Sequence, residues 1–98
     1  MIDPKIFIRN WIETYIDNII KEPQLTEQTA KSMFKKLGIE PSLDAVLCYI
    51  MGICTGSIAA MADLTELNRD DLTIEMMEIV YRRIIELKEI MLSQRIHK

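Results

Sequence analysis

The feature of this sequence that most restricts its fold is an uncharged run, AVLCYIMGICTGSIAAMA, over residues 45–62. Its length reaches the roughly 18 apolar residues at which a membrane-spanning helix has to be considered. Thr55, Ser57 and several glycines and alanines make the run less apolar than its length suggests. Its flanks, Asp44 and Asp63, are acidic rather than basic or aromatic. We therefore expect a buried helix of a soluble protein here, with a membrane span as the alternative.

Spacing this run at about 100° per residue divides the helix into two faces of different bulk. One face carries large side chains: Val46, Leu47, Ile50, Met51, Ile53, Ile58 and Met61. The other carries Tyr49 and otherwise only small residues: Ala45, Cys48, Gly52, Thr55, Gly56, Ala59, Ala60 and Ala62. A glycine inside a helix costs about 1 kcal/mol relative to alanine, so we expect a compensating contact. Close approach of another helix to the small-residue face would supply dense van der Waals contact.

Apolar spacing and terminal signals predict two helices before this run. The first is expected over residues 4–21, with Asp3 as its N-cap and a proline shortly after its end. The second is expected over residues 27–37, capped by Thr26 and ended by Gly38 in a left-handed conformation. The third helix, over residues 43–64, contains the uncharged run.

The fourth predicted helix is long, over residues 71–95, with Asn68 or Asp70 as its N-cap. Together these segments predict an all-α fold, a four-helix bundle-like domain with a central apolar third helix and a long C-terminal fourth helix. The chain is short enough, at 98 residues, for all of it to form a single domain, residues 1–98.

The C-terminal helix also has a broad apolar face. A seam at spacings of three and four contains Met77, Val80, Ile84, Leu87 and Met91, and one side is extended by Ile74, Tyr81, Ile85 and Leu92. Because two such helices carry more apolar surface than a chain of this size covers by itself, we predict a homo-oligomer, most simply a two-fold dimer. A monomer in which the other three helices wrap the central one is the alternative. The expected interface residues are Cys48, Tyr49, Gly52, Gly56, Ala59, Ala60, Met77, Val80, Ile84, Leu87 and Met91.

The two cysteines indicate a reducing environment. Cys48 and Cys54 lie on one predicted helix with their Cα atoms roughly 9 Å apart, which is beyond the reach of a disulfide. We interpret both as buried, reduced thiols, as expected of a cytoplasmic protein. No secretory signal peptide is expected at the N-terminus.

Sequence signatures of catalysis are scarce. No phosphate-loop, dinucleotide-binding or cysteine–histidine metal motif occurs, so we expect no catalytic residue and no cofactor. The single histidine, His97, is expected to be solvated at the end of the last helix. One alternative is a Mg²⁺-dependent, all-α nucleotide-processing enzyme that uses carboxylates at the third helix, the fourth helix and their junction. Its candidate metal ligands are Asp63, Glu66, Asp70, Asp71, Glu75 and Glu78. They form no paired, repeated acidic motif, and a solvated corner is the simpler interpretation.

The charge pattern argues against nucleic-acid binding. The net charge is −3, and no lysine or arginine occurs between residues 37 and 68. The segment KKLGIEPSLDAVL has a helix, a glycine turn and a second helix, but this second helix lacks the basic groups of a DNA-reading helix. We therefore expect no nucleic-acid partner.

The residues favour a non-catalytic protein-interaction or assembly module over an enzyme. The expected partner is a second copy of the chain, and another protein is a further option. A Mg²⁺-dependent enzyme and a small single-span membrane protein are the alternatives.

Overall fold

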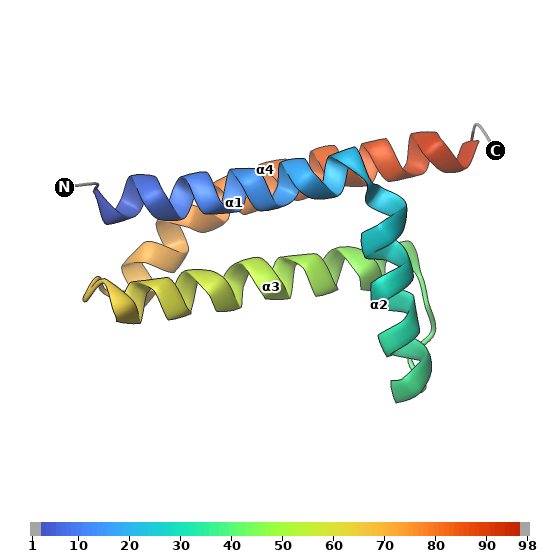
Figure 1. Cartoon of the computed structure of the whole chain (residues 1–98), viewed down its shortest axis with the longest axis horizontal. Coiled ribbons are helices and arrows are strands. Elements are labelled where there is room, and N and C mark those ends of the chain that lie inside the picture. The colour runs from blue at the N-terminus through green and yellow to red at the C-terminus, as the bar shows by residue number, and fades with distance from the viewer. Residues whose placement is uncertain (1–2, 97–98) are drawn as a thin grey trace.

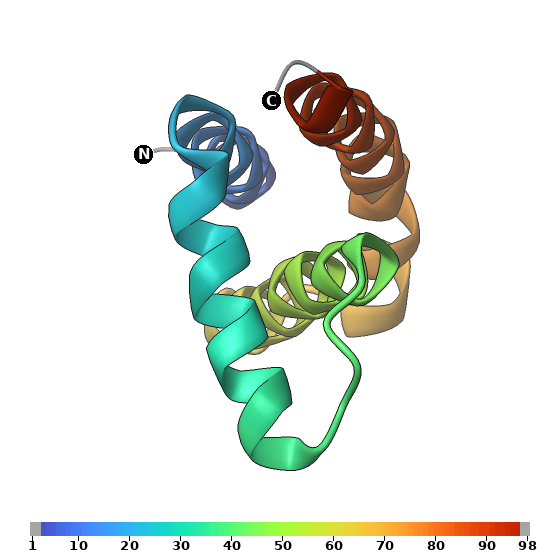
Figure 2. The same cartoon turned by 90° about the vertical axis from the view of Figure 1, so that its right-hand side faces the viewer.

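The computed structural model describes residues 3–96, and His97 lies outside this range. The described chain forms four helices: α1 (Pro4–Lys21), α2 (Pro23–Leu37), α3 (Leu43–Leu64) and α4 (Arg69–Ile96). Helices α1, α3 and α4 follow the longest dimension of the molecule, while α2 crosses them at one end and projects past α3 (Figure 1). Seen end-on, α1, α3 and α4 lie at the corners of a triangle (Figure 2). The predicted all-α fold, with an apolar third helix and a long fourth helix, is confirmed.

Three helix starts have side-chain caps, and those at Asp3 and Asn68 are the caps expected from the sequence. A carboxylate oxygen of Asp3 accepts a hydrogen bond from the Lys5 amide at 2.9 Å, with a proline in the first turn of α1. The Ser42 hydroxyl accepts from the Ala45 amide at 3.1 Å at the start of α3. At α4 the Asn68 side-chain oxygen accepts from the amide of Asp71 at 2.9 Å. Asn68 is therefore the cap, and α4 begins two residues earlier than expected.

The predicted start of α2 is wrong. The helix begins at Pro23 rather than at residue 27, and Glu22 is the only residue between it and α1. A proline cannot continue α1, but its fixed φ and missing N–H suit the first turn of a new helix. Thr26 therefore lies inside α2. The predicted end is confirmed, because Gly38 has a φ of 72° and the Ile39 amide donates to the Phe34 carbonyl oxygen at 2.8 Å.

The core lies between the three long helices. Helix α1 contributes four isoleucines at helical spacing, and the bulky face of α3 packs opposite them with the apolar seam of α4. The buried α1 residues are Ile8, Ile12, Ile16 and Ile19, and the α3 residues include Val46, Leu47, Ile50, Cys54 and Ile58. The buried α4 residues are Leu72, Met76, Met77, Val80, Ile84, Leu87 and Met91. No polar or charged residue within 3–96 is buried, so this core is held by apolar packing.

Ion pairs line the edge where α1 meets α4. The Arg83 side chain is 15% exposed and pairs with Glu13 and Asp17 of α1, as well as with Glu86 on its own helix. Nearer the start of both helices, the Lys5 ammonium lies 3.1 Å from the Glu75 carboxylate. This side of the core is therefore bordered by pairs of opposite charge.

Candidate protein-interaction surface

The small-residue face of α3 points away from the core except at Ala62, which is fully buried. Its row at every fourth position, formed by Cys48, Gly52, Gly56 and Ala60, is exposed along its whole length. A Cβ atom added at Gly52 or Gly56 would meet no other atom within 4 Å. Within the described chain, nothing packs closely against either glycine. Any compensating contact for these glycines would therefore come from outside residues 3–96.

The two cysteines lie on opposite faces of α3. Cys54 is fully buried, as predicted, and its burial raises the pKa of the thiol to about 11. Cys48 is exposed, so the prediction that both thiols are buried is wrong for this residue. The sequence places Cys48 in an apolar run, but its position in the small-residue row determines which side it faces.

Helices α3 and α4 run antiparallel in one continuous register. The Asp44 carboxylate lies 3.5 Å from the Lys88 ammonium, and the Thr55 hydroxyl lies 3.6 Å from the Met77 sulfur. At the far end of α3, Asp63 pairs with Arg69. From each of these pairs to the next, the number of residues passed along α3 equals the number passed in the opposite direction along α4. The two helices therefore stay side by side over the full length of α3.

A row of large apolar side chains on α4 borders the small-residue face. Around the helix, this row lies next to Met77 and Lys88, the α4 residues that contact α3, on the side away from the core. Its members are exposed by 42 to 73%: Ile74, Tyr81, Ile85 and Leu92. The small residues of α3 thus form a low strip beside a raised apolar row. We call this surface the α3–α4 face, comprising Cys48, Gly52, Gly56, Ala59, Ala60, Ile74, Tyr81, Ile85 and Leu92.

The predicted interface residues separate into two groups. The α3 residues lie at least partly on the surface: Cys48, Tyr49, Gly52, Gly56, Ala59 and Ala60. The α4 residues all lie in the core of the chain itself: Met77, Val80, Ile84, Leu87 and Met91. The exposed α4 row adjoins their seam. Its spacing of seven, four and seven residues places it on the apolar side of the helix, but does not tell which part of that side the chain leaves exposed.

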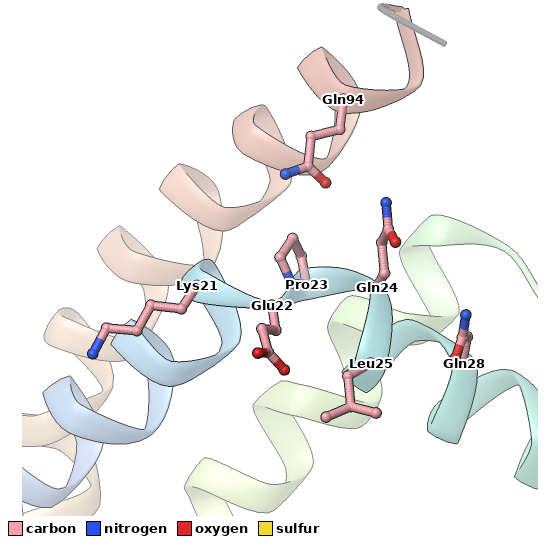
Figure 3. Close-up of a pocket in the computed structure, with 7 residues that line it drawn as sticks. All are labelled: Lys21, Glu22, Pro23, Gln24, Leu25, Gln28 and Gln94. Carbon is pink, nitrogen blue, oxygen red and sulfur yellow. The ribbon is translucent and has the colours of Figure 1, made fainter.

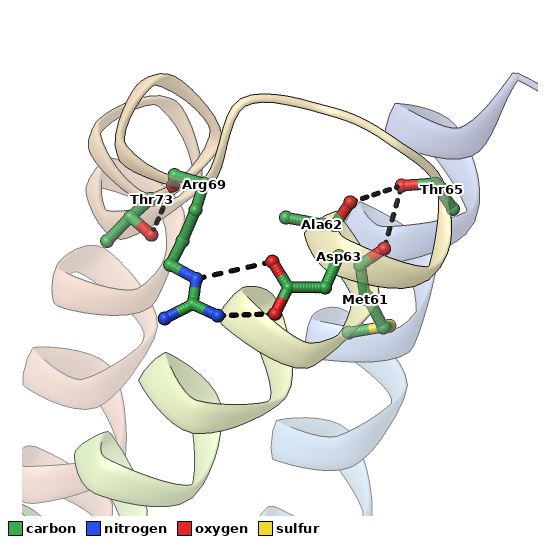
Figure 4. A network of polar contacts seen from close by, with 6 residues as sticks. All are labelled: Met61, Ala62, Asp63, Thr65, Arg69 and Thr73. Carbon is green, nitrogen blue, oxygen red and sulfur yellow. Dashed lines mark hydrogen bonds and ion pairs between the residues drawn. The ribbon is translucent and has the colours of Figure 1, made fainter.

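The acidic corner between α3 and α4 does not assemble a metal site. Arg69 donates to the Asp63 carboxylate, and this hydrogen bond raises the pKa of the guanidinium (Figure 4). The Thr65 hydroxyl donates to the Met61 and Ala62 carbonyl oxygens, which closes the end of α3. Across residues 3–96, no three acidic, cysteine or histidine side chains come close enough to hold a metal ion together. The six candidate ligands named above are therefore not brought together.

A second feature is a cleft at the elbow between α1 and α2, where Gln94 of α4 faces the start of α2 (Figure 3). It is lined by Lys21, Glu22, Pro23, Gln24, Leu25, Gln28 and Gln94. Glutamine and aliphatic side chains dominate this lining, and it includes no cysteine or histidine nucleophile. Leu25 is its exposed large apolar side chain, whereas the α3–α4 face has four of them on α4.

By length and composition α3 could also cross a membrane, a test that core helices of soluble proteins pass as well. In its most apolar stretch 33% of the residues are buried in the fold. Comparison of the chain with protein-family models, curated proteins and solved structures gave no match. The interpretation of the α3–α4 face therefore rests on the chain's own residues.

Proposed function

We propose that this protein is a non-catalytic assembly module of the cytoplasm that forms a homodimer through its α3–α4 face. The observation that carries the proposal is the exposure of four large apolar side chains of α4 beside a row of small residues on α3. Soluble monomers seldom expose a long continuous apolar surface, and such surfaces mark interaction sites.

The composition of the face supports self-association. The low strip on α3 lets a second backbone come close, while the α4 row supplies side chains that lose water on contact. A two-fold dimer uses the same patch on both copies, so one face satisfies both partners. The two internal glycines then gain the close helix contact that no helix of the described chain provides.

The two alternatives have less support. A Mg²⁺-dependent enzyme needs converging carboxylates, whereas Asp63 is paired with Arg69 and Glu75 with Lys5. A membrane span would require α3 to leave its contacts with α1, α2 and α4, and acidic residues flank its uncharged run. Partition of the expressed chain into the membrane fraction would favour the second alternative over the proposal.

The test is molar mass measured by light scattering over a range of micromolar concentrations. The wild-type chain of 11.4 kDa should show twice its mass. Ile85→Glu places a charge in the face and should weaken the dimer at least tenfold, or by about 1.4 kcal/mol. The matched control is Ile6→Glu, because Ile6 of α1 is 55% exposed and Ile85 is 61% exposed.

The control should remain dimeric. A wild-type chain that stays monomeric throughout the range would overturn the proposal. A dimer that Ile6→Glu disrupts and Ile85→Glu leaves intact would assign the interface to a different surface.

A further inference from the structure

We infer that the two copies pack antiparallel, with the two-fold axis crossing α3 between Gly52 and Gly56. Cys48 of one copy then lies against Ala60 of the second copy. This inference rests on the proposed dimer and specifies its geometry. Three features of the exposed surface carry it: the row on α3, the charge at its two ends, and the part of α2 that projects past α3.

The exposed row is symmetric about its centre. Cys48, Gly52, Gly56 and Ala60 follow each other at every fourth position, so small residues extend equally in both directions from the midpoint. Rows of this spacing form the ridges by which helices align when they pack against each other. An antiparallel two-fold axis at the midpoint pairs Gly52 with Gly56 of the second copy, where the backbones come closest.

Charge is unevenly distributed between the two ends of the face. Beside the end of α3 lie Glu66, Asp70 and Asp71, which form no salt bridge with a basic side chain in the described part of the chain. Beside the start of α3, the C-terminal half of α2 carries Lys36, which lies about 60° around the helix from the exposed Met33, whereas Lys35 lies on the opposite side of α2. An antiparallel dimer brings the acidic end of each copy to the lysine-bearing end of the other. A parallel dimer would bring the acidic ends together, at a cost in repulsion.

The projecting half of α2 provides an apolar match for the same arrangement. This half extends past α3 on the side away from α1 (Figures 1 and 2). It leaves Leu37 71% exposed and Met33 45% exposed. At the opposite end of the row, Leu64 is 84% exposed. Only the antiparallel arrangement brings Leu64 of the second copy toward α2, where these side chains can lose water together.

Disulfide trapping in the full-length chain tests the geometry. In the antiparallel dimer, Cys48 lies roughly 18 Å along the helix from Cys48 of the second copy, which is too far for a disulfide. Ala60→Cys places a thiol opposite Cys48. Under copper-phenanthroline and air, this variant should form a covalent dimer that non-reducing gels resolve, while the wild-type chain should not. The double variant Cys48→Ser with Ala60→Cys is the matched control and should stay uncrosslinked.

Each result separates the geometry from the proposed function. Covalent dimers of the wild-type chain through Cys48 would show a parallel arrangement and overturn this inference, while leaving the assembly proposal in place. A chain that is dimeric by light scattering but gives no covalent dimer with Ala60→Cys would also overturn the geometry. A monomeric wild-type chain would overturn the proposed function itself.

A charge exchange tests the same geometry without an added thiol. Lys36→Glu, on the projecting half of α2, should weaken the dimer several-fold by placing a carboxylate against the acidic end of the second copy. Adding Glu66→Lys to that variant should restore most of the affinity in the antiparallel arrangement. Absence of rescue, measured by light scattering at low salt, would contradict the proposed pairing of the two ends.

Discussion

The side chains on the two faces of α3 differ in volume more than in polarity. The inner face places Val46, Ile50 and Ile58 in a fully buried core, whereas the outer face leaves two glycines open to contact. Both faces belong to one uncharged run. The comparison teaches that hydropathy alone does not decide which side of such a helix is buried. Side-chain volume distinguishes most of the two faces here, because large side chains gain more by leaving water and fill the space between helices, although Cys54 and Ala62 are small and fully buried.

Truncating a side chain should lower the free energy of unfolding most on the inner face of α3. Ile50→Ala removes buried methylene groups from a closed core and should lower the free energy of unfolding by about 2–5 kcal/mol. On the outer face, the matched truncation Cys48→Ala should change it by less than about 0.5 kcal/mol in the monomer. Denaturant unfolding at low protein concentration measures both. Equal losses for the two variants would show that the faces are not distinguished by burial.

Much of this contrast could be predicted from the sequence. The bounds of α1 and α3, the caps at Asp3 and Ser42 and the glycine end of α2 follow from local signals that act within a few residues. The division of α3 into a bulky and a small face also follows from its periodicity. Such features are determined by the chain's immediate neighbours, so the sequence records them directly.

The remaining features depend on contacts between distant segments. The single residue Glu22 between α1 and α2 sends α2 across the end of the bundle, and no periodic pattern encodes that crossing. The α4 residues predicted for an interface, such as Val80 and Leu87, became core because α1 and α3 cover them. Ile85 remains outside because it lies further around the same helix. Periodicity identified the apolar sides of α4 but not which of them the chain itself would cover.

A smaller effect of opposite sign is expected at the outer glycines. Gly52→Ala adds a Cβ atom that meets nothing within 4 Å, so the monomer gains helix propensity without a clash. Its free energy of unfolding should rise by up to about 1 kcal/mol in dilute solution. Gly38→Ala is the informative contrast, because Gly38 has a φ of +72°, and alanine there should cost about 1 kcal/mol.

The free energy of unfolding of both variants can be measured by thermal or denaturant unfolding at a protein concentration too low for dimers to form. A loss of stability on Gly52→Ala under those conditions would indicate that the outer face is already occupied within the single chain. The same substitution should weaken association, because the added methyl group separates the two backbones. Opposite signs in the two measurements would show that the glycines are kept for contact between copies.

The last effect is confined to alkaline pH, where we expect a loss of stability that depends on the inner cysteine. Burial raises the pKa of the Cys54 thiol from its ordinary value of 9.0 to about 11. Between these values the unfolded chain releases this proton and the folded chain retains it, so the stability contributed by Cys54 is complete below pH 9 and declines as pH rises toward 11.

Burial likewise raises the pKa of Tyr15 from its ordinary value of 10.0 to about 12, with Cys54 and Tyr49 contributing further, so Tyr15 adds a loss of stability of its own from about pH 10 upward. Cys54→Ala should therefore flatten the fall in unfolding free energy between pH 9 and pH 11, whatever its stability at neutral pH. Cys48→Ala, on the exposed face, should reproduce the wild-type slope. Identical slopes for wild type and Cys54→Ala would mean that the buried thiol does not resist ionisation. The inner face of α3 would then be more accessible to water than its packing indicates.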